Sequence, residues 1–276
     1  MIKQAIIPLA GLGTRLLPLT SVIPKELLPM NGKAGLVYIL EECVQAGIKE
    51  IIFIISKKKE NIKKYFYNDD LFKKIIKKKK NKRILDEYKK ILKYRKMIKF
   101  VYQNKPAGTG DAVLKTQKLI KDKFFLMLLP DDLILKKNCS KAMIKIHNTK
   151  KCSVMASMLV KKKNVRRWGI YSVKSKIGKK NFYIDDVVEK PEIKYAPSNN
   201  AVIGRYILPK IIFKKLKKQK KGKGGEIHIT DSIKSLVKEG HTFIGHKFDG
   251  KYLDCGTMSG YIKSSLEISK IWNFVW

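Results

Sequence analysis

Apolar runs that alternate with helical patterns in the first half of the chain constrain the fold more than any other feature. Strands are indicated where residues are apolar at consecutive positions, namely 3–10, 50–56, 99–103 and 124–130. Helices are indicated between them at 35–47 and 112–120, and Gly47 gives the first helix a C-terminal stop. Strands that are apolar on both faces and separated by helices are typical of a parallel sheet covered on both sides.

The second half of the chain is a mixture of strands and helices. Strands are indicated in succession at 152–160, 168–173, 182–190, 201–208 and 242–250, and helices at 209–218 and 230–239. The lysine-rich segment 57–96 is helical in pattern and is expected to be an excursion over the surface. No internal repeat or linker divides the 276 residues. We therefore predict a single α/β domain over 1–276, with a Rossmann-like mixed, mainly parallel sheet flanked by helices.

A loop suited to an anion follows the first predicted strand. The stretch "GLGTRLLPLTSVIPKELLP" (11–29) places Gly11 and Gly13 at the strand exit, with Arg15 and Lys25 beyond them. In open α/β sheets ligands bind at the carboxyl ends of the strands, and glycines let backbone N–H groups approach phosphate oxygens. The third glycine of a dinucleotide fingerprint and the Gly-Lys-Ser/Thr of a P-loop are both absent. Arg15 and Lys25 can instead neutralise a triphosphate.

The formal net charge of +38 raises the possibility of a nucleic-acid partner. The excess is almost entirely lysine, with 55 Lys against 6 Arg, and it is spread along the chain. Base-reading proteins depend on arginine with interleaved aromatic side chains, and that pattern is missing. We therefore interpret the charge as a solvated surface, and a nucleic-acid-binding protein remains the alternative from another functional class.

Cysteine usage and hydropathy indicate the compartment. The four cysteines, Cys43, Cys139, Cys152 and Cys255, form no CxxC pair, so neither a zinc site nor a disulfide framework is expected. No apolar run reaches the roughly 18 residues that span a bilayer, so no membrane partner is expected. The sequence therefore predicts a cytoplasmic protein.

The loop at 11–29 resembles the signature of sugar-1-phosphate nucleotidylyltransferases, which is Gly-x-Gly-Thr-Arg followed by a proline and a Pro-Lys pair. Five stretches, the end of that loop "IPKELLP" and then "VVEKP", "APSN", "IGRYIL" and "GGEIHITDSI", resemble the bacterial UTP–glucose-1-phosphate uridylyltransferases in order and spacing. The similarity extends over about 3–265. It implies that UTP and glucose 1-phosphate give UDP-glucose and pyrophosphate. The same chemistry with dTTP, in a glucose-1-phosphate thymidylyltransferase, is the near alternative, and a non-catalytic relative that binds sugar nucleotides is a third.

The resemblance implies a Mg²⁺ site. Asp131 and Asp132 follow the strand at 124–130, and neighbouring strand residues point to opposite faces, so only one of them can face the ligand squarely. The resemblance assigns that role to Asp131 and gives the second carboxylate as Asp254 in "KYLDCGT". Magnesium takes one or two carboxylates together with substrate phosphates. Catalysis would consist of alignment and electrostatics, with Arg15, Lys25 and Lys190 as the catalytic residues.

The sugar-binding residues are expected within elaborations at 160–230. Glu189 would accept hydrogen bonds from sugar hydroxyls, and Lys190 would hold the sugar phosphate. Gly169, Gly204, Glu226 and Thr230 complete the expected sugar side. Glu226 could equally serve the start of the helix near 230–239.

The nucleotide side is expected at the glycine loop and at "QNKPAGTGDAV". The Gln103 amide offers a donor and an acceptor for the O4 and N3–H edge of uracil, and Gly108 lies in a glycine turn beside it. Ala10, Gly11 and Gly13 would supply backbone contacts. Two departures from the family are "KAGLVY" at 33–38 and Asp111, where the family frequently has histidine.

The segment 265–276 ends in the apolar residues Ile271, Trp272, Phe274, Val275 and Trp276. Such a cluster needs a partner, either the core of the same chain or a second subunit. Because enzymes of the resembling family generally self-associate, a homo-oligomer, dimer or tetramer, is expected.

Overall fold

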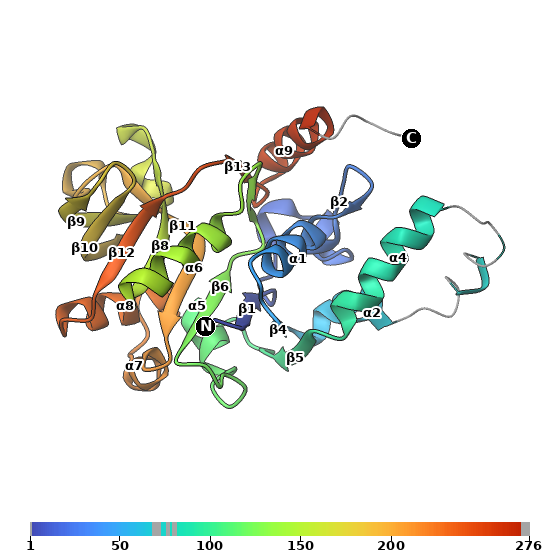
Figure 1. Ribbon diagram of the computed structural model, residues 1–276, viewed down its shortest axis with the longest axis horizontal. Helices are drawn as coiled ribbons and strands as arrows, with labels where there is room; N and C mark the ends of the chain where they lie inside the picture. The colour runs from blue at the N-terminus through green and yellow to red at the C-terminus, as the bar shows by residue number, and fades with distance from the viewer. Residues whose placement is uncertain (1, 68–72, 76–77, 79–81, 272–276) are drawn as a thin grey trace.

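The computed structural model describes residues 2–67, 73–75, 78 and 82–271. Its centre is a nine-stranded sheet in the order β5-β4-β1-β6-β11-β8-β12-β10-β9 (Figure 1). In chain order these strands are β1 (Gln4–Pro8), β4 (Glu50–Ile55), β5 (Ile98–Tyr102), β6 (Phe124–Leu128), β8 (Ser153–Leu159), β9 (Gly169–Ile177), β10 (Asn181–Glu189), β11 (Asn200–Pro209) and β12 (Phe243–Lys247).

The sheet is mixed, as predicted. The four strands of the first half, β5, β4, β1 and β6, are mutually parallel. In the second half β11 runs antiparallel between β6 and β8, and β10 and β9 form an antiparallel edge. The only parallel pair described there is β8 with β12. The parallel part therefore carries the glycine loop, while the antiparallel part extends the sheet on the side expected to bind the sugar.

Helices cover both faces of the sheet. One core includes residues of α1 (Gly35–Gln45), α2 (Glu60–Tyr67), α6 (Cys139–Lys150) and α9 (Met258–Ile271). The other includes residues of α5 (Thr109–Leu114), α7 (Ile212–Lys218) and α8 (Ile229–Lys238). Neighbours on β1 show why the strands are apolar at consecutive positions, because Ile6 belongs to the second core and Ile7 to the first. Each central strand is buried on both faces.

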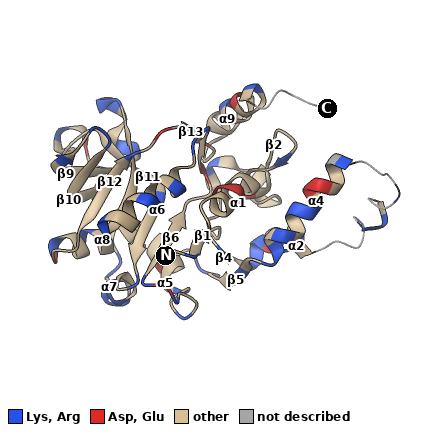
Figure 2. Cartoon of the chain, viewed as in Figure 1, with Lys and Arg blue, Asp and Glu red and all other residues tan. Residues whose placement is uncertain are grey.

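The lysine-rich excursion is helical where it is described. It contains α2 and α4 (Lys82–Arg95), and α4 lies at one end of the molecule (Figure 1). Lysine and arginine are spread over helices and turns at both ends of the molecule in this view (Figure 2). No described helix is both long and apolar enough to span a membrane. All four cysteines are free.

Several elements were not predicted from the sequence. The helix α6 begins at Cys139, after the capping residue Asn138, whose side chain accepts a hydrogen bond from Lys141 N, and α9 follows the last strand. Two small ribbons were also missed, β2 (Pro29–Met30) with β3 (Lys33–Ala34), and β7 (Asp132–Leu135) with β13 (Lys251–Asp254). The helix α5 ends at Leu114, earlier than the predicted 120.

Candidate active site

A cleft of about 540 Å³ opens at the carboxyl ends of β1, β5 and β6, where α/β sheets bind ligands. The structure brings together in its lining most of the side chains and glycines selected from the sequence: Ala10, Gly11, Gly13, Arg15, Lys25, Gln103, Gly108, Asp131, Glu189, Lys190, Glu226 and Thr230. Gly169, Gly204 and Asp254 do not line the cleft, but each neighbours a residue that does, namely Glu189, Leu129 and Asp131 respectively.

The glycine loop keeps its backbone open to the cleft. Gly13 has a φ of 68°, which favours glycine, and Thr20 Oγ1 donates to its carbonyl oxygen at 2.8 Å. A Cβ added at Gly11 would meet no atom within 4 Å, so the space beside this backbone is free. Ala10 is buried at the end of β1, and Arg15 is exposed on a short 3₁₀ turn. The loop thus presents its backbone and one guanidinium group to the same space.

Lys25 and Asp131 form an ion pair in the wall of the cleft, with 2.7 Å between Nζ and Oδ2. Burial alone lowers the pKa of Lys25, but the neighbouring carboxylates of Asp131 and Glu26 outweigh it and raise the pKa. Burial alone would raise the pKa of Asp131, but the Lys25 ammonium outweighs it and lowers the pKa. Both groups are therefore held in their charged forms.

A second, buried ion pair fixes the backbone that carries Lys25. Lys59 Nζ lies 2.8 Å from both carboxylate oxygens of Glu26, and both side chains are buried. Because Glu26 follows Lys25 directly, this contact ties the end of the glycine loop to the segment after β4. A long, flexible lysine side chain is positioned more closely when its backbone is held in this way.

Two carboxylates converge where β6 leads into β7. The register of β7 with β13 places Asp254 opposite Asp132. Gly256 lies between the carboxylates, since a Cβ added there would be 3.1 Å from Asp131 Oδ2 and 3.3 Å from Asp254 Oδ1. We call Asp131, Asp254 and Gly256 the metal cradle. Its donor set suits magnesium, which takes one or two carboxylates and completes its shell with phosphate and water oxygens.

Cations of the chain flank the metal cradle. Arg15 Nη1 lies 3.7 Å from the same added Cβ, and Arg167 Nη2 donates to Asp254 Oδ2 at 3.1 Å. Within the described residues no group of three or more His, Cys, Asp or Glu could hold a metal ion. A metal at the cradle would therefore depend on substrate oxygens for its remaining ligands.

The Asp132 side chain does not line the cleft and is held by hydrogen bonds within the chain. Its carboxylate accepts hydrogen bonds from Tyr252 Oη at 2.6 Å and from Gly204 N at 2.9 Å. Burial, together with the neighbouring charge of Asp131, raises the pKa of Asp132 to about 6. Of the two aspartates, Asp131 is thus the one that lines the cleft.

A buried arginine braces the turn between β6 and β7. Arg205 is fully buried on β11, and its guanidinium group donates to both carboxylate oxygens of Glu42 at 2.8–3.0 Å. It also donates to the backbone carbonyls of Leu129 and Asp132, on either side of Asp131. Neither Arg205 nor Glu42 was selected from the sequence. The signal was present, because a charged residue inside an apolar strand requires a buried partner.

The expected sugar side divides into cleft residues and packing residues. Glu189 and Lys190 line the cleft at the end of β10, with 3.5 Å between Oε1 and Nζ. Gly169 is their neighbour across the ribbon, and a Cβ there would lie 3.2 Å from Glu189 Oε2. Gly204 is placed differently from the expectation, because a Cβ there would meet Asp132 and Leu129 side chains at 2.6 Å. Its evident role is close packing under the metal cradle.

The loop after β5 interlocks with the segment before α8. Gly110 N donates to Ile227 O at 2.7 Å, and Ile227 N donates to Ala107 O at 2.9 Å. Gly108 has a φ of 94°, and a Cβ there would lie 2.6 Å from Ile227 O. This close backbone approach holds Glu226 at the cleft. The start of α8 is instead formed by His228, so Glu226 does not cap that helix.

Gln103 is buried at the floor of the cleft and is held by two acceptors. Its Nε2 donates to Gly108 O at 3.1 Å and to Asp111 Oδ2 at 2.7 Å. Both amide hydrogens are therefore used within the chain. Only the amide oxygen of Gln103 is therefore left for a ligand, whereas the sequence predicted that both the donor and the acceptor of the amide would be available.

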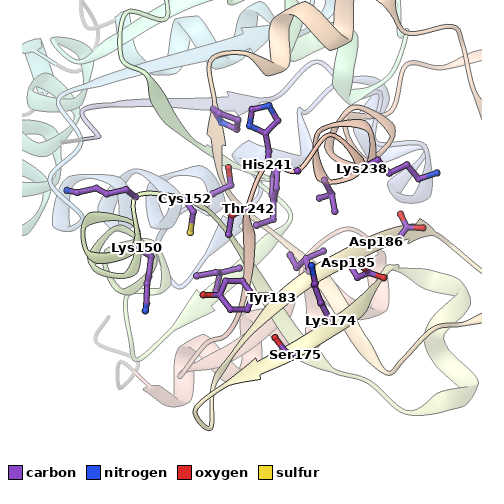
Figure 3. A pocket seen from close by; sticks show the side chains of 18 of the residues that line it. Lys150, Cys152, Lys174, Ser175, Tyr183, Asp185, Asp186, Lys238, His241 and Thr242 are labelled. Atoms are coloured by element: carbon purple, nitrogen blue, oxygen red, sulfur yellow. The ribbon is translucent and has the colours of Figure 1, made fainter.

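A larger hollow of about 1110 Å³ lies elsewhere, between the ends of β8, β10 and β12 (Figure 3). The side chains around it include Lys174, Asp186 and His241, and in Figure 3 Lys150 and Lys238 extend away from each other. None of the residues selected from the sequence lines it. We identify the smaller cleft as the site, because among the described residues it is lined by the glycine loop, by Arg15 and Lys25, and by Asp131, beside which Asp254 lies.

The nucleotidyl transferase family matches residues 4–271 of this chain. A UTP–glucose-1-phosphate uridylyltransferase of Mycoplasma pneumoniae is 38% identical over 267 residues, which are 96% of this chain and 91% of that protein. The enzyme of that name from Pseudomonas aeruginosa is 36% identical over 273 residues, with 96% and 95% covered. A crystal structure of UDP-glucose pyrophosphorylase complexed with UDP-glucose superposes with a TM-score of 0.87 and 34% identity, over 98% of this chain and 100% of that one.

Proposed function

Because the chain belongs to the nucleotidyl transferase family, we propose that it transfers the uridylyl group of UTP to glucose 1-phosphate, giving UDP-glucose and pyrophosphate. The observation that supports this most strongly is the sequence similarity to proteins named UTP–glucose-1-phosphate uridylyltransferase, which extends over almost the whole of this chain and of each relative. The family resemblance inferred from the sequence motifs is confirmed.

The reaction joins a phosphate oxygen of the sugar phosphate to the α-phosphorus of UTP and breaks the bond to the β-phosphate. The attacking oxygen is already anionic at neutral pH, so no general base is needed. What the protein must supply is alignment and positive charge along the triphosphate. Arg15, the open backbone at Gly11 and Gly13, and Lys25 are placed to do this in one wall of the cleft.

The family typically requires a divalent metal, and we propose Mg²⁺ held by Asp131 and Asp254. The ion would neutralise charge on the triphosphate during transfer. The support is the metal cradle, where both carboxylates face one point kept open by Gly256. When the triphosphate binds, Lys25 can exchange its contact with Asp131 for one with phosphate.

Of the remaining residues at the cleft, some would bind the sugar phosphate and others the base of the nucleotide. Glu189 would accept hydrogen bonds from glucose hydroxyls, and Lys190 would hold the sugar phosphate, because the two side chains are adjacent at the mouth of the cleft. Glu226 and Thr230 lie on the same lining, while Gly169 leaves room for the Glu189 carboxylate. Gln103 and Gly108 lie where the base would bind.

Two alternatives remain distinguishable by experiment. A pyrimidine with N3–H satisfies the Gln103 oxygen whether it is uracil or thymine, so dTTP is a competing substrate. A nucleic-acid-binding protein is disfavoured because lysine and arginine are not confined to one face or element: they colour α2 and α4 and also the helices and turns at the opposite end of the molecule (Figure 2).

The direct test is pyrophosphate release from UTP, measured with and without glucose 1-phosphate and Mg²⁺. Release should require both, and dTTP and CTP in place of UTP should rank the nucleotides. Lys174→Met, an exposed lysine outside the cleft, serves as the matched control for substitutions of Lys25. Absence of sugar-dependent release with every nucleotide would overturn the proposal.

We further propose that the chain is one nucleotidyltransferase domain, because one sheet runs through both halves of the described chain. We also propose that it acts in the cytoplasm.

A homo-oligomer is proposed from helix α9, which exposes Met258, Ile262 and Leu266 at intervals of four residues, on one side of the helix. Trp272, Phe274, Val275 and Trp276, on which the expectation was based, lie outside the described residues. Removal of 272–276 together with Ile262→Ser should lower the mass in light scattering. An unchanged mass would show that α9 and the residues after it are not the interface.

A further inference from the structure

The orientation of one amide at the floor of the cleft is set by the chain itself. Gln103 Nε2 is shared between the carbonyl oxygen of Gly108 and the carboxylate of Asp111. Both partners are acceptors, and a carboxylate has no hydrogen to donate. The amide nitrogen must therefore face them. Its oxygen is left for the cleft, and no donor among the described residues reaches it.

We propose that Asp111 is a specificity-determining positioning residue, which fixes the Gln103 amide so that the site accepts nucleotides whose base carries a hydrogen at N3. This inference rests on the proposed function and adds to it the device that reads the base. Asp111 does not line the cleft and acts only through Gln103.

The placement of Asp111 suits this role. It lies in the first turn of α5, directly behind Gln103, and only 17% of its side chain is exposed. The Oδ2 atom holds Gln103, while Oδ1 lies 3.4 Å from Lys115 Nζ on the next turn. The carboxylate is thus held between an amide and an ammonium group.

The bases respond differently to a fixed acceptor. Uracil and thymine present N3–H, which can donate to the Gln103 oxygen. Cytosine presents a lone pair at N3, so two acceptors would face each other without a hydrogen. Leaving a buried polar group unpaired in this way lowers affinity by about tenfold to a hundredfold. If the amide could turn over, its N–H would instead satisfy cytosine.

The test is the ratio of UTP to CTP affinity, measured by calorimetric titration of each nucleotide with Mg²⁺. Asp111→Asn replaces the closer of the two acceptors by a group that can also donate, so only the longer contact with Gly108 O still favours the native orientation of the Gln103 amide, and the turned orientation becomes populated. The ratio should fall on the order of tenfold in this variant, chiefly through tighter CTP binding. Asp111→Glu retains the carboxylate and should keep the ratio within about twofold to threefold of the native value.

Two further variants make the result specific. Lys115→Gln removes the ammonium neighbour but leaves the carboxylate, so the native ratio should persist. In a Gln103→Ala background, Asp111→Asn should have no further effect on the ratio, because Asp111 no longer has an amide to orient. An unchanged ratio in Asp111→Asn, or an equal fall in Lys115→Gln, would refute the role of Asp111. A native protein that binds neither nucleotide would refute the proposed function first, and one that binds both equally would refute this inference alone.

Discussion

A single methyl group at the metal cradle should separate metal binding from folding. Gly256→Ala adds a carbon at the point that both carboxylates face. That carbon would be 3.1 Å from Asp131 Oδ2 and 3.3 Å from Asp254 Oδ1, closer than ordinary carbon–oxygen contact. The backbone at Gly256 is not in the left-handed region, so alanine fits its φ. The strain falls on the ends of two flexible side chains, which can move aside.

The expected magnitude follows from this geometry. Magnesium holds its ligands at about 2.0–2.1 Å in a near-octahedral shell, so displacing both carboxylates by a few tenths of an ångström disturbs two ligands at once. Changes that misplace metal ligands without removing them typically cost 10- to 100-fold in affinity. We expect the affinity for the metal to fall within that range. The free energy of unfolding should change by no more than about 1 kcal/mol, because the moved groups are side-chain ends.

The assay is Mn²⁺ binding followed by electron paramagnetic resonance, with urea unfolding of the same samples. Asp131→Asn, which removes a ligand outright, provides the comparison for severe loss. If Gly256→Ala binds Mn²⁺ as tightly as the native protein while Asp131→Asn does not, the carboxylates do not need the space at Gly256. The placement of the ion between them would then be wrong.

Three other outcomes are expected. Lys25→Met should lower turnover about 100-fold or more, the scale for a charge contact made in the transition state, and near-native turnover would exclude that contact. Arg205→Met should cost about 3–5 kcal/mol in urea unfolding, because the Glu42 carboxylate keeps its hydrogen bonds from Ser140 but stays buried without a cation. Glu42→Leu in the same chain should recover most of the loss. Burial lowers the pKa values of His147 and His246 below the ordinary 6.5. As the pH falls, these two histidines are therefore protonated in the unfolded chain before they are protonated in the folded one. Their contribution to the free energy of unfolding should be full above pH 6.5 and should decrease below it, and His147→Gln should make that decrease with pH smaller.

Local patterns were sufficient for the parallel half of the fold. Strands such as β4 are buried on both faces and have no polar alternation, and α1 ends just before Gly47, so their positions follow from neighbouring residues alone. The glycine loop could be located for the same reason, since its glycines and cations lie within a few residues of a strand end. Helix α6 could also have been found, because Asn138 is a strong capping residue ahead of an apolar pattern.

Long-range contacts could not be obtained in this way. The ribbon of β7 and β13 joins Tyr252 to Asp132 across 120 positions, and nothing in either short segment specifies the other. Gly204 looked like a sugar contact because its motif lies beside the site, but its backbone packs against Leu129. The orientation of the Gln103 amide is likewise invisible in the sequence, because it depends on which partners the fold brings to Nε2.

The pairing of β7 with β13 also determines when the site can exist during protein synthesis. The glycine loop and the parallel strands need only the first half of the chain, whereas Arg205 meets Glu42 across 163 positions. The metal cradle needs Asp254 and Gly256 as well. A ribosome-bound chain shorter than this can display a cationic loop but has no second carboxylate beside it. Fragments that end before β13 therefore lack Asp254 and Gly256 and should not transfer a nucleotide.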